Sequence, residues 1–291
     1  MAEQTSGAFL RVAPGVFVLL WSTGFIGAKL GLPDAEPLTF LLLRFAIVCT
    51  LLLVLALVLR RPWPTDRRQA LHIAVAGVLL HGAYLGGVFS AIHRGMPAGP
   101  VALIVGMQPL LTALLGGRLL GERVGPKQWA GLLLGFVGVV LVLSGKLALA
   151  GASAAGLALA LLALLSITAG TLYQKRFCGQ MDLWTGSLLQ FAATSLVLLP
   201  LALTTETMQV NWSGNFIFAL AWLVLVLSLG AITLLHLLIR RGAATRVSTL
   251  FYLTPPVTAL MAWAMFGEQL DLLALAGMAL AAAGVALALK R

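Results

Sequence analysis

The sequence predicts an all-α integral membrane protein, with ten transmembrane helices arranged as two inverted five-helix repeats and both termini in the cytoplasm. Three observations predict this fold class: an apolar composition, a regular series of apolar runs, and an internal repeat offset by half the chain. Of the 291 residues, 60% are hydrophobic and only 10% are charged, whereas soluble proteins carry about 25% charged residues. This composition excludes a soluble enzyme, a secreted domain and a nucleic-acid-binding protein, despite a formal net charge of +10.

Apolar runs separated by Gly, Pro and charged residues place the ten spans. A transmembrane helix needs about 20 apolar residues, so ten helices with short connections account for nearly the whole chain. The first run is too long and too poorly flanked for a cleaved signal peptide, and we expect it to remain in the mature protein. The expected spans are 12–31, 37–59, 70–92, 97–119, 127–145, 153–175, 183–203, 214–237, 244–266 and 271–289.

Basic residues orient these helices. With the N-terminus inside, 15 of the 19 Lys and Arg residues fall in cytoplasmic segments, three face the opposite side, and Arg44 lies within the second span. Cytoplasmic loops carry an excess of Lys and Arg, and such residues also contact anionic lipid headgroups. Both termini are therefore predicted to be cytoplasmic, and membrane lipid is an expected partner.

The second half of the chain repeats the first at an offset of 146 residues, without a gap. The predicted units are residues 1–145 and 146–291. Because each unit holds an odd number of spans, the second must enter the membrane upside down. Inverted repeats are common in secondary transporters, which bind substrate near the midplane between the halves. Aligned identities are Gly24 and Gly170, Lys29 and Lys175, Phe45 and Phe191, Arg94 and Arg240, Pro109 and Pro255, Gly121-Glu122 and Gly267-Glu268, and Gly131 and Gly277.

Several motifs resemble those of a known family over essentially the whole chain. They are Trp21-Ser-Thr-Gly24-Phe-Ile-Gly-Ala-Lys29, Leu43-Arg44-Phe45, Pro109-Leu-Leu-Thr-Ala and Gly121-Glu122-Arg123, with second copies of the last two around Pro255 and Gly267-Glu268. The chain is similar to the drug/metabolite transporter superfamily, EamA-type branch, and within it to bacterial amino-acid exporters.

This resemblance implies a secondary transporter of the bacterial cytoplasmic (inner) membrane that exports amino acids and related small metabolites by alternating access. Alternatives are an exporter of drugs or other metabolites, or a channel-like facilitator. We expect no cofactor, no nucleic acid and a monomer or homodimer.

Polar side chains inside apolar spans are expensive to bury, and they are therefore candidates for the substrate site. His81 lies near the middle of the third span, and Tyr84 follows at i+3, on the same face of a regular helix. The imidazole would hydrogen-bond an amino acid and the phenol would form a wall; the alternative is a histidine bonded to a neighbouring helix. His236 lies near a span end and is expected at the membrane interface.

Pro109 and Pro255 occupy equivalent mid-span positions and are predicted hinges. Each proline removes a backbone donor and loosens the preceding turn, which leaves carbonyl groups for a substrate, a water or a neighbour. Gln108 directly precedes the first proline and is a candidate substrate-binding residue. Prolines are also common in membrane helices without a special role, but their repetition at one offset favours hinges.

Two small polar clusters at equivalent depth are expected to line a central cavity. They are Trp21-Ser22-Thr23 and residues 166–169, so Trp21, Ser22 and Ser166 are candidate substrate-binding residues. Serine can instead bond to its own helix carbonyls. Tyr252 is a further candidate, with core packing as its alternative.

Arg44 lies roughly 10 Å deep in the second span, at about 1.5 Å per residue. An ion pair with Asp34 or Glu36 is the favoured interpretation. Snorkelling outward and contact with a carboxylate substrate are the alternatives.

Absent motifs narrow the function. The nine carboxylates all fall in loops or at span ends, which disfavours a proton-coupled exporter of lipophilic cations, because an intramembrane acid is expected there. No H-E-x-x-H motif and no G-x-x-x-x-G-K-[ST] loop occur, so we expect no metal site, no ATP hydrolysis and no enzyme. Gly131-x3-Gly135 and Gly277 predict close helix packing, either as supports or as an oligomer contact.

Overall fold

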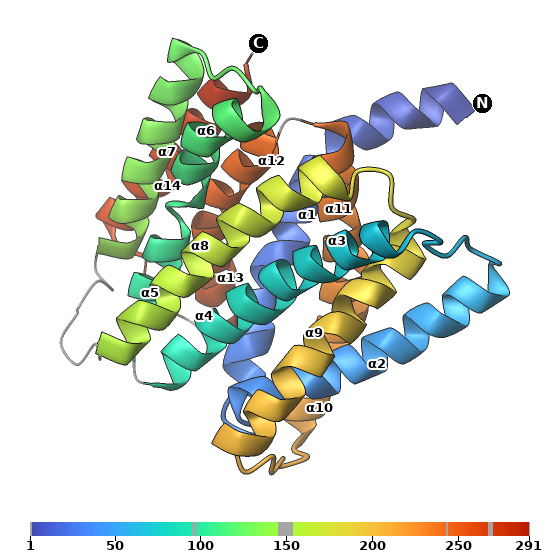
Figure 1. Cartoon of the computed structure of the whole chain (residues 1–291). Helices are drawn as coiled ribbons and strands as arrows, with labels where there is room; N and C mark the ends of the chain where they lie inside the picture. Colours follow the sequence, from blue (N-terminus) through green and yellow to red (C-terminus); the bar gives the residue numbers. More distant parts are fainter. Residues whose placement is uncertain are drawn as a thin grey trace.

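The computed structural model describes residues 2–94, 96, 98–144, 154–242, 244–266 and 270–290, which form a bundle of helices (Figure 1). The first half holds α1 (Ala2–Gly31), α2 (Pro37–Val58), α3 (Arg67–Gly77), the π-helix η1 (Val78–Ala83), α4 (Tyr84–His93), α5 (Ala98–Val105), α6 (Gln108–Leu120) and α7 (Pro126–Leu143). The second half holds α8 (Ala154–Phe177), α9 (Leu183–Thr205), α10 (Gly214–Trp222), the π-helix η3 (Leu223–Ala231), α11 (Ile232–Arg241), α12 (Ala244–Thr249), the 3₁₀-helix η4 (Leu250–Leu253), α13 (Thr254–Phe266) and α14 (Leu272–Leu289).

The predicted membrane class is confirmed. Within the described residues, nine helical stretches are long and apolar enough to cross a membrane, and Val12–Ala28 of α1 is a shorter apolar stretch. The expected and observed boundaries differ by a few residues: the span predicted at 37–59, for example, is the helix Pro37–Val58. The tenth span and the orientation of the termini stay predictions.

Local chemistry explains where several helices begin. Asp66, Asp182, Ser213 and Asp271 each precede a helix, and each side chain accepts a hydrogen bond from a backbone N–H of the first turn. Such caps satisfy donors that have no partner within the helix. All four residues lie in the connections between apolar runs, directly before the helix that each one caps.

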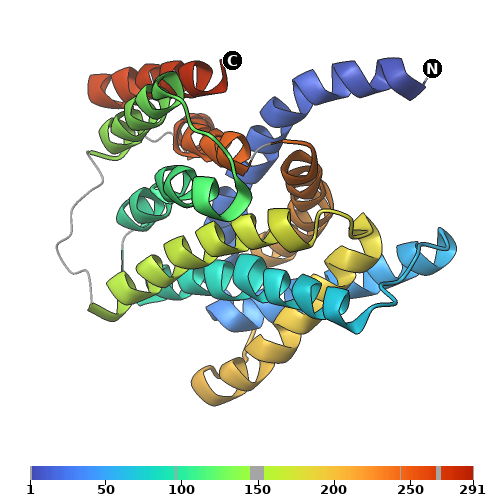
Figure 2. The ribbon, with the colours of Figure 1, turned by 45° about the horizontal axis from the view of Figure 1, so that its top comes forward.

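Helices α7 and α14 pack backbone to backbone and lie side by side in both views (Figures 1 and 2). A Cβ atom at Gly131 would meet Gly284 O and Ala288 N closer than 3 Å, and one at Gly138 would meet Gly277 O and Ala281 N as closely. The predicted close packing is therefore confirmed, and the two glycine stripes face each other within the chain. An oligomer contact through these two helices stays a prediction.

Helices of one half pack against helices of the other half. Helix α1 contacts α10, η3 and α13, and its counterpart α8 contacts their counterparts α3, η1 and α6. Helices α2 and α9, also counterparts under the 146-residue offset, pack against each other. This reciprocal pattern is what two halves related by a two-fold axis would produce, and the inverted repeat itself stays a proposal.

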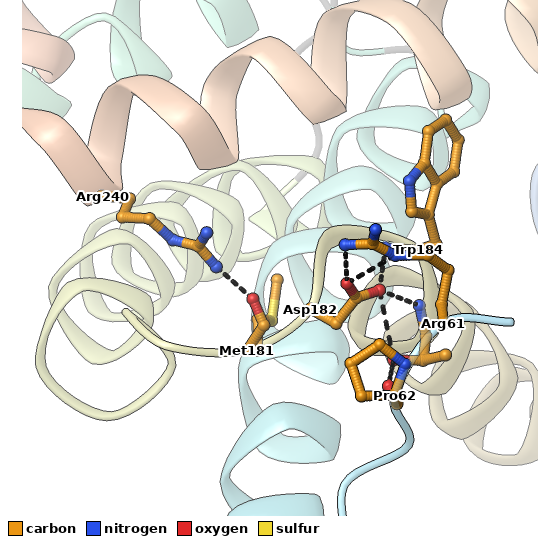
Figure 3. A network of polar contacts seen from close by, with 7 residues as sticks. Arg61, Pro62, Met181, Asp182, Trp184 and Arg240 are labelled. Carbon is orange, nitrogen blue, oxygen red and sulfur yellow. Dashed lines mark hydrogen bonds and ion pairs between the residues drawn. The ribbon is translucent and has the colours of Figure 1, made fainter. Parts of the chain in front are cut away.

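Hydrogen bonds join the basic connections at one end of the bundle, which we call the basic end. Arg61 Nε donates to Asp182 Oδ2 at 3.0 Å, and the Arg240 guanidinium donates to the Met181 carbonyl (Figure 3). Lys175 Nζ donates to the carbonyls of Ile239, Arg240 and Gly242 at 2.7–3.2 Å. Helices α2, α8 and α11 therefore all end at the basic end.

Candidate substrate-binding cavity

A cavity lies between helices of both halves. Its walls come from α1, α4, α5, α6, α8, η4 and α13. The lining residues are Trp21, Tyr84, Val88, Val101, Val105, Gly106, Gln108, Ile167, Phe251, Thr254 and Pro255. Among the candidates chosen from the sequence, the cavity thus brings together Trp21, Tyr84, Gln108 and Pro255.

The cavity extends from the middle of the bundle away from the basic end. Helix α3 starts near that end, and the chain then runs through η1 and α4 to His93. Val88 is five residues before His93, and Val101 is in the first turn of α5, which starts on the same far side. Gln108 and Thr254 lie at mid-depth and form the inner limit of the cavity.

An aromatic cluster forms one wall. The Trp21 ring lies 5.3 Å from Phe251, with the ring planes perpendicular, and 5.3 Å from Phe17. Phe17 and Phe251 also meet edge to face at 5.5 Å. Such pairs hold rings in fixed positions, so the indole is a preformed apolar surface rather than a mobile side chain.

Helix interruptions form the inner limit. A turn at Gly106-Met107 separates α5 from α6, and the 3₁₀-helix η4 separates α12 from α13. Pro109 and Pro255 are each the second residue of the helix that follows. A backbone N–H at this position would have no carbonyl partner within the helix, so a proline there costs no hydrogen bond. Both interruptions therefore lie directly before the repeated prolines. A role for these prolines as hinges remains a prediction.

Two polar groups at this inner limit have no hydrogen-bond partner among the described residues. They are Gln108 Oε1 and Thr254 Oγ1, and both side chains are buried. The amide nitrogen of Gln108, Nε2, donates to Thr171 Oγ1 at 3.4 Å. Buried polar atoms are nearly always satisfied, so these two atoms mark where a polar group of a ligand or a water would bind.

Pairs of equivalent residues surround the inner limit. Under the 146-residue offset, Trp21 corresponds to Ile167, Val105 to Phe251 and Gln108 to Thr254, and all six line the cavity. Tyr84, Val88 and Val101 line it as well, but their counterparts Gly230, Leu234 and Val247 do not. The inner part of the cavity is therefore built from both halves, and the outer part from the first half alone.

Other candidates lie near the cavity without lining it. Ser22 donates to Val18 O at 2.7 Å and is fully buried beneath Trp21. Ser166 is buried beside Ile167. Tyr252 is fully buried, with its ring over Gly135 of α7. Pro109 is buried next to Gln108.

His81 and Tyr84 do not share a helix face, contrary to the expectation. The His81 ring stacks on Phe191 of α9 at 4.5 Å, whereas Tyr84 lines the cavity. The cause is η1, because a π-turn holds more residues than an α-turn and rotates the side chains that follow it. His81 therefore lies in a separate buried polar cluster.

This cluster corrects two further expectations. Arg44 is buried and donates from Nε to Ser228 Oγ at 2.9 Å, so the ion pair expected with Asp34 or Glu36 is wrong. Those two carboxylates instead accept hydrogen bonds from the connection between α9 and α10. His236 is 2% exposed rather than interfacial, with Nδ1 3.4 Å from Ser187 Oγ.

The sequence reasoning missed the aromatic partners of Trp21. Phe17 is four residues before Trp21 on α1, and this spacing could have indicated a shared face. The other partner, Phe251, lies in the second half of the chain. Its ring contact with Trp21 joins the two halves, and no local pattern in the sequence reveals it.

An apolar bundle of membrane-spanning helices with a cavity between its two halves is typical of membrane transporters. The chain belongs to the EamA-like transporter family, whose profile matches residues 14–144 and again residues 154–290. It is a multi-pass protein of the inner membrane, and the family is one of transporters.

Named relatives cover most of the chain. It is 27% identical over 253 residues to an uncharacterized inner membrane transporter of Escherichia coli K12, YedA, covering 87% of this chain and 81% of the relative. A probable amino-acid metabolite efflux pump of the same organism is 27% identical over 92% of this chain and 90% of its own. A solved structure titled "Crystal structure of protein" aligns with a TM-score of 0.78 and 22% identity over 96% of both chains, which supports the fold.

Proposed function

We propose that the protein exports amino acids and related small metabolites by alternating access of the cavity between its two halves. The observation that carries this proposal is the composition of the cavity lining. Equivalent residue pairs surround its inner part, and residues of the first half alone form its outer part. In two inverted repeats that exchange conformations, the counterparts Gly230, Leu234 and Val247 would line a cavity toward the basic end.

The chemistry of the lining suits an amino acid. Gln108 and Thr254 begin α6 and α13, and a helix N-terminus carries a partial positive charge that favours a carboxylate. Their unpartnered oxygens, Gln108 Oε1 and Thr254 Oγ1, would accept hydrogen bonds from an ammonium group. Trp21 and Phe251 would contact an apolar side chain. No Asp, Glu, Lys or Arg lines the described cavity, which favours a zwitterion over an ion of net charge.

The membrane topology belongs to the same proposal. We infer ten spans in two inverted units, 1–145 and 146–291, with both termini in the cytoplasm. Support comes from the distribution of basic residues, from the two family matches and from the reciprocal packing of α1 and α8. With this orientation the basic end is cytoplasmic, and the described cavity faces the opposite side of the membrane.

Flux in proteoliposomes tests the proposal. Vesicles preloaded with labelled amino acids are assayed for efflux that saturates with substrate, with and without an imposed pH gradient. Gln108→Leu and Trp21→Ala are expected to reduce the flux about tenfold or more, because each loses a contact worth about 1–3 kcal/mol. The matched control is Trp263→Ala, since Trp263 is 56% exposed on the outer surface of the bundle.

The outcomes separate the alternatives. Equal flux in Trp21→Ala, Gln108→Leu and Trp263→Ala would contradict the cavity as the substrate site. Movement of a dye or drug but of no amino acid would exclude amino-acid export and support an exporter of drugs or other metabolites. Flux that does not saturate would indicate a channel-like facilitator. A response to the pH gradient would indicate proton coupling, and its absence a uniporter.

A further inference from the structure

A second, smaller pocket lies at the basic end. It is formed by the last turns of α8, the connection at 178–183 and the end of α11, and it shares no lining residue with the cavity. Gln174, Met181, His236 and Arg240 line it. Gln174 is seven residues beyond the cavity residue Ile167 on α8, which is about 10 Å along the helix. The proposed transport function makes no use of this pocket.

His236 presents an unsatisfied polar group here. The side chain is 2% exposed, and its Nδ1 lies 3.4 Å from Ser187 Oγ. Its Nε2 has no partner among the described residues. In the tautomer in which the Ser187 hydroxyl donates to Nδ1, a neutral ring carries its proton on Nε2. The imidazole then offers an N–H donor without an acceptor.

Gln174 offers a second donor. Its Oε1 accepts a hydrogen bond from Gln190 Nε2 at 2.7 Å, which fixes the orientation of the amide. Its Nε2 has only Met181 Sδ, at 3.6 Å. A thioether is a weak acceptor, so the amide N–H remains available for a stronger one. Gln174 is itself 3% exposed.

The charges around the pocket are positive. The Arg240 guanidinium lies at its edge and uses a donor on the Met181 carbonyl (Figure 3), and a guanidinium has five N–H donors in all. Lys175 Nζ donates to three carbonyls at the end of α11, which neutralises the partial negative charge of that helix end. Asp182, the carboxylate beside the pocket, is held in an ion pair with Arg61.

We propose that this pocket binds a small monovalent anion, either chloride or the carboxylate group of a small organic acid. Nε2–H of His236, the amide N–H of Gln174 and free N–H groups of Arg240 supply the donors. The anion would satisfy buried groups that otherwise lack partners, and it would balance the Arg240 charge. The ligand need not be the transported substrate, so this proposal does not depend on the proposed function.

Thermal unfolding of the purified full-length protein in detergent tests the site without any transport assay. The Tm is measured against increasing sodium chloride or sodium acetate, with the sodium salt of the bulky buffer MOPS holding the ionic strength constant. A ligand that binds only the folded state raises the Tm in a saturable way. We expect half-saturation to move at least about tenfold higher in Arg240→Gln and His236→Gln, since each loses a hydrogen bond to the anion.

Arg241→Gln is the matched control. It removes the same charge from the adjacent residue, which is exposed and does not line the pocket. A saturable rise with both salts, or with either salt alone, supports the site and identifies its preferred anion, provided that it is weakened in the two pocket variants and unchanged in Arg241→Gln. No saturable rise, or an equal rise in all variants, overturns it. His236→Gln keeps a polar side chain, so it decides the matter if Arg240→Gln fails to fold.

Discussion

Under the proposed alternating access, the contact between Glu122 and α12 keeps the basic end of the bundle closed, and its removal should open that end. Glu122 follows α6, and its carboxylate accepts hydrogen bonds from Ala244 N at 2.6 Å, Thr245 N at 3.1 Å and Thr245 Oγ1 at 2.9 Å. Because α6 and the α12–η4–α13 segment both line the cavity, this cap joins the two halves on the side away from its opening. In the alternating-access proposal, these helix ends separate when the cavity faces the basic end.

Glu122→Gln keeps the shape of the side chain and removes its charge. Hydrogen bonds to a charged group contribute about 1.5–3 kcal/mol, and a carboxylate at a helix N-terminus adds about 0.3–1 kcal/mol. Glu122 is partly exposed, so we take about 2 kcal/mol for the whole change. At about 1.4 kcal/mol for each factor of ten, the ratio of the two conformations shifts about 30-fold toward the state open at the basic end.

Glu206 provides a control with matched hydrogen bonds. It accepts from Leu38 N, Thr39 N and Thr39 Oγ1 at 2.7–2.8 Å, but it caps α2, which does not line the cavity. Glu206→Gln should therefore lower the Tm about as much as Glu122→Gln without changing access to the cavity. This pair separates a loss of stability from a shift between conformations.

The assay uses a single reporter cysteine at Val105, in a background without Cys49 and Cys178. An impermeant thiol reagent is added from one side of oriented membranes at a time. Labelling from the basic side should rise about 30-fold in Glu122→Gln, as long as that state remains the minor one, and should be unchanged in Glu206→Gln. Equal labelling in the two variants, with similar losses of Tm, would refute the role of Glu122 as a closing contact.

Three further predictions concern stability and reactivity. Gly138→Ala should destabilise the protein by about 1–3 kcal/mol, because its Cβ would meet the α14 backbone; Gly15→Ala, with nothing within 4 Å, should not lower the Tm. The hydrogen bond from the Thr207 side chain lowers the pKa of Glu36 below 4.5. The stabilisation by this carboxylate is therefore complete above pH 4.5 and is lost as the pH falls through the lowered pKa. Glu36→Gln should remove this part of the acid dependence of Tm. Burial raises the pKa of Cys178 to about 12, so in a Cys49→Ser background maleimide at pH 8 should label it only after unfolding, and fast labelling of folded protein would contradict this burial.

The sequence predicted the helices well because a membrane leaves the backbone few options. Every backbone polar group in a span must be satisfied within the helix or by the protein around it, so an apolar run of sufficient length predicts a helix such as Pro37–Val58 with small boundary errors. The repeated prolines drew attention to Pro255 and to Gln108, which precedes Pro109, and both residues line the cavity. Trp21 was predicted as part of the polar cluster Trp21-Ser22-Thr23, and Tyr84 because it follows His81 at i+3.

What the sequence could not predict depends on local helix geometry and on contacts between distant segments. The π-turn that separates His81 from Tyr84 lies in an ordinary apolar run, with no residue that marks it. Arg44 was paired with Asp34 or Glu36 because they are near in sequence, but the connection between α9 and α10 uses both carboxylates. His236 is near a span end in the sequence and is nevertheless covered by other helices.

Several residues that line the cavity differ from their counterparts in the other repeat. Gly106 lines the cavity, whereas its counterpart Tyr252 is fully buried with its ring against Gly135. Tyr84 also lines it, and its counterpart is Gly230. Exchange of the two conformations would therefore not produce equivalent cavities. Gly230 would take the place of Tyr84, and Tyr252 would take the place of Gly106. Two inverted halves with different lining residues would hold the same substrate with unequal strength on the two sides of the membrane, which for a carrier makes one side favour binding and the other release.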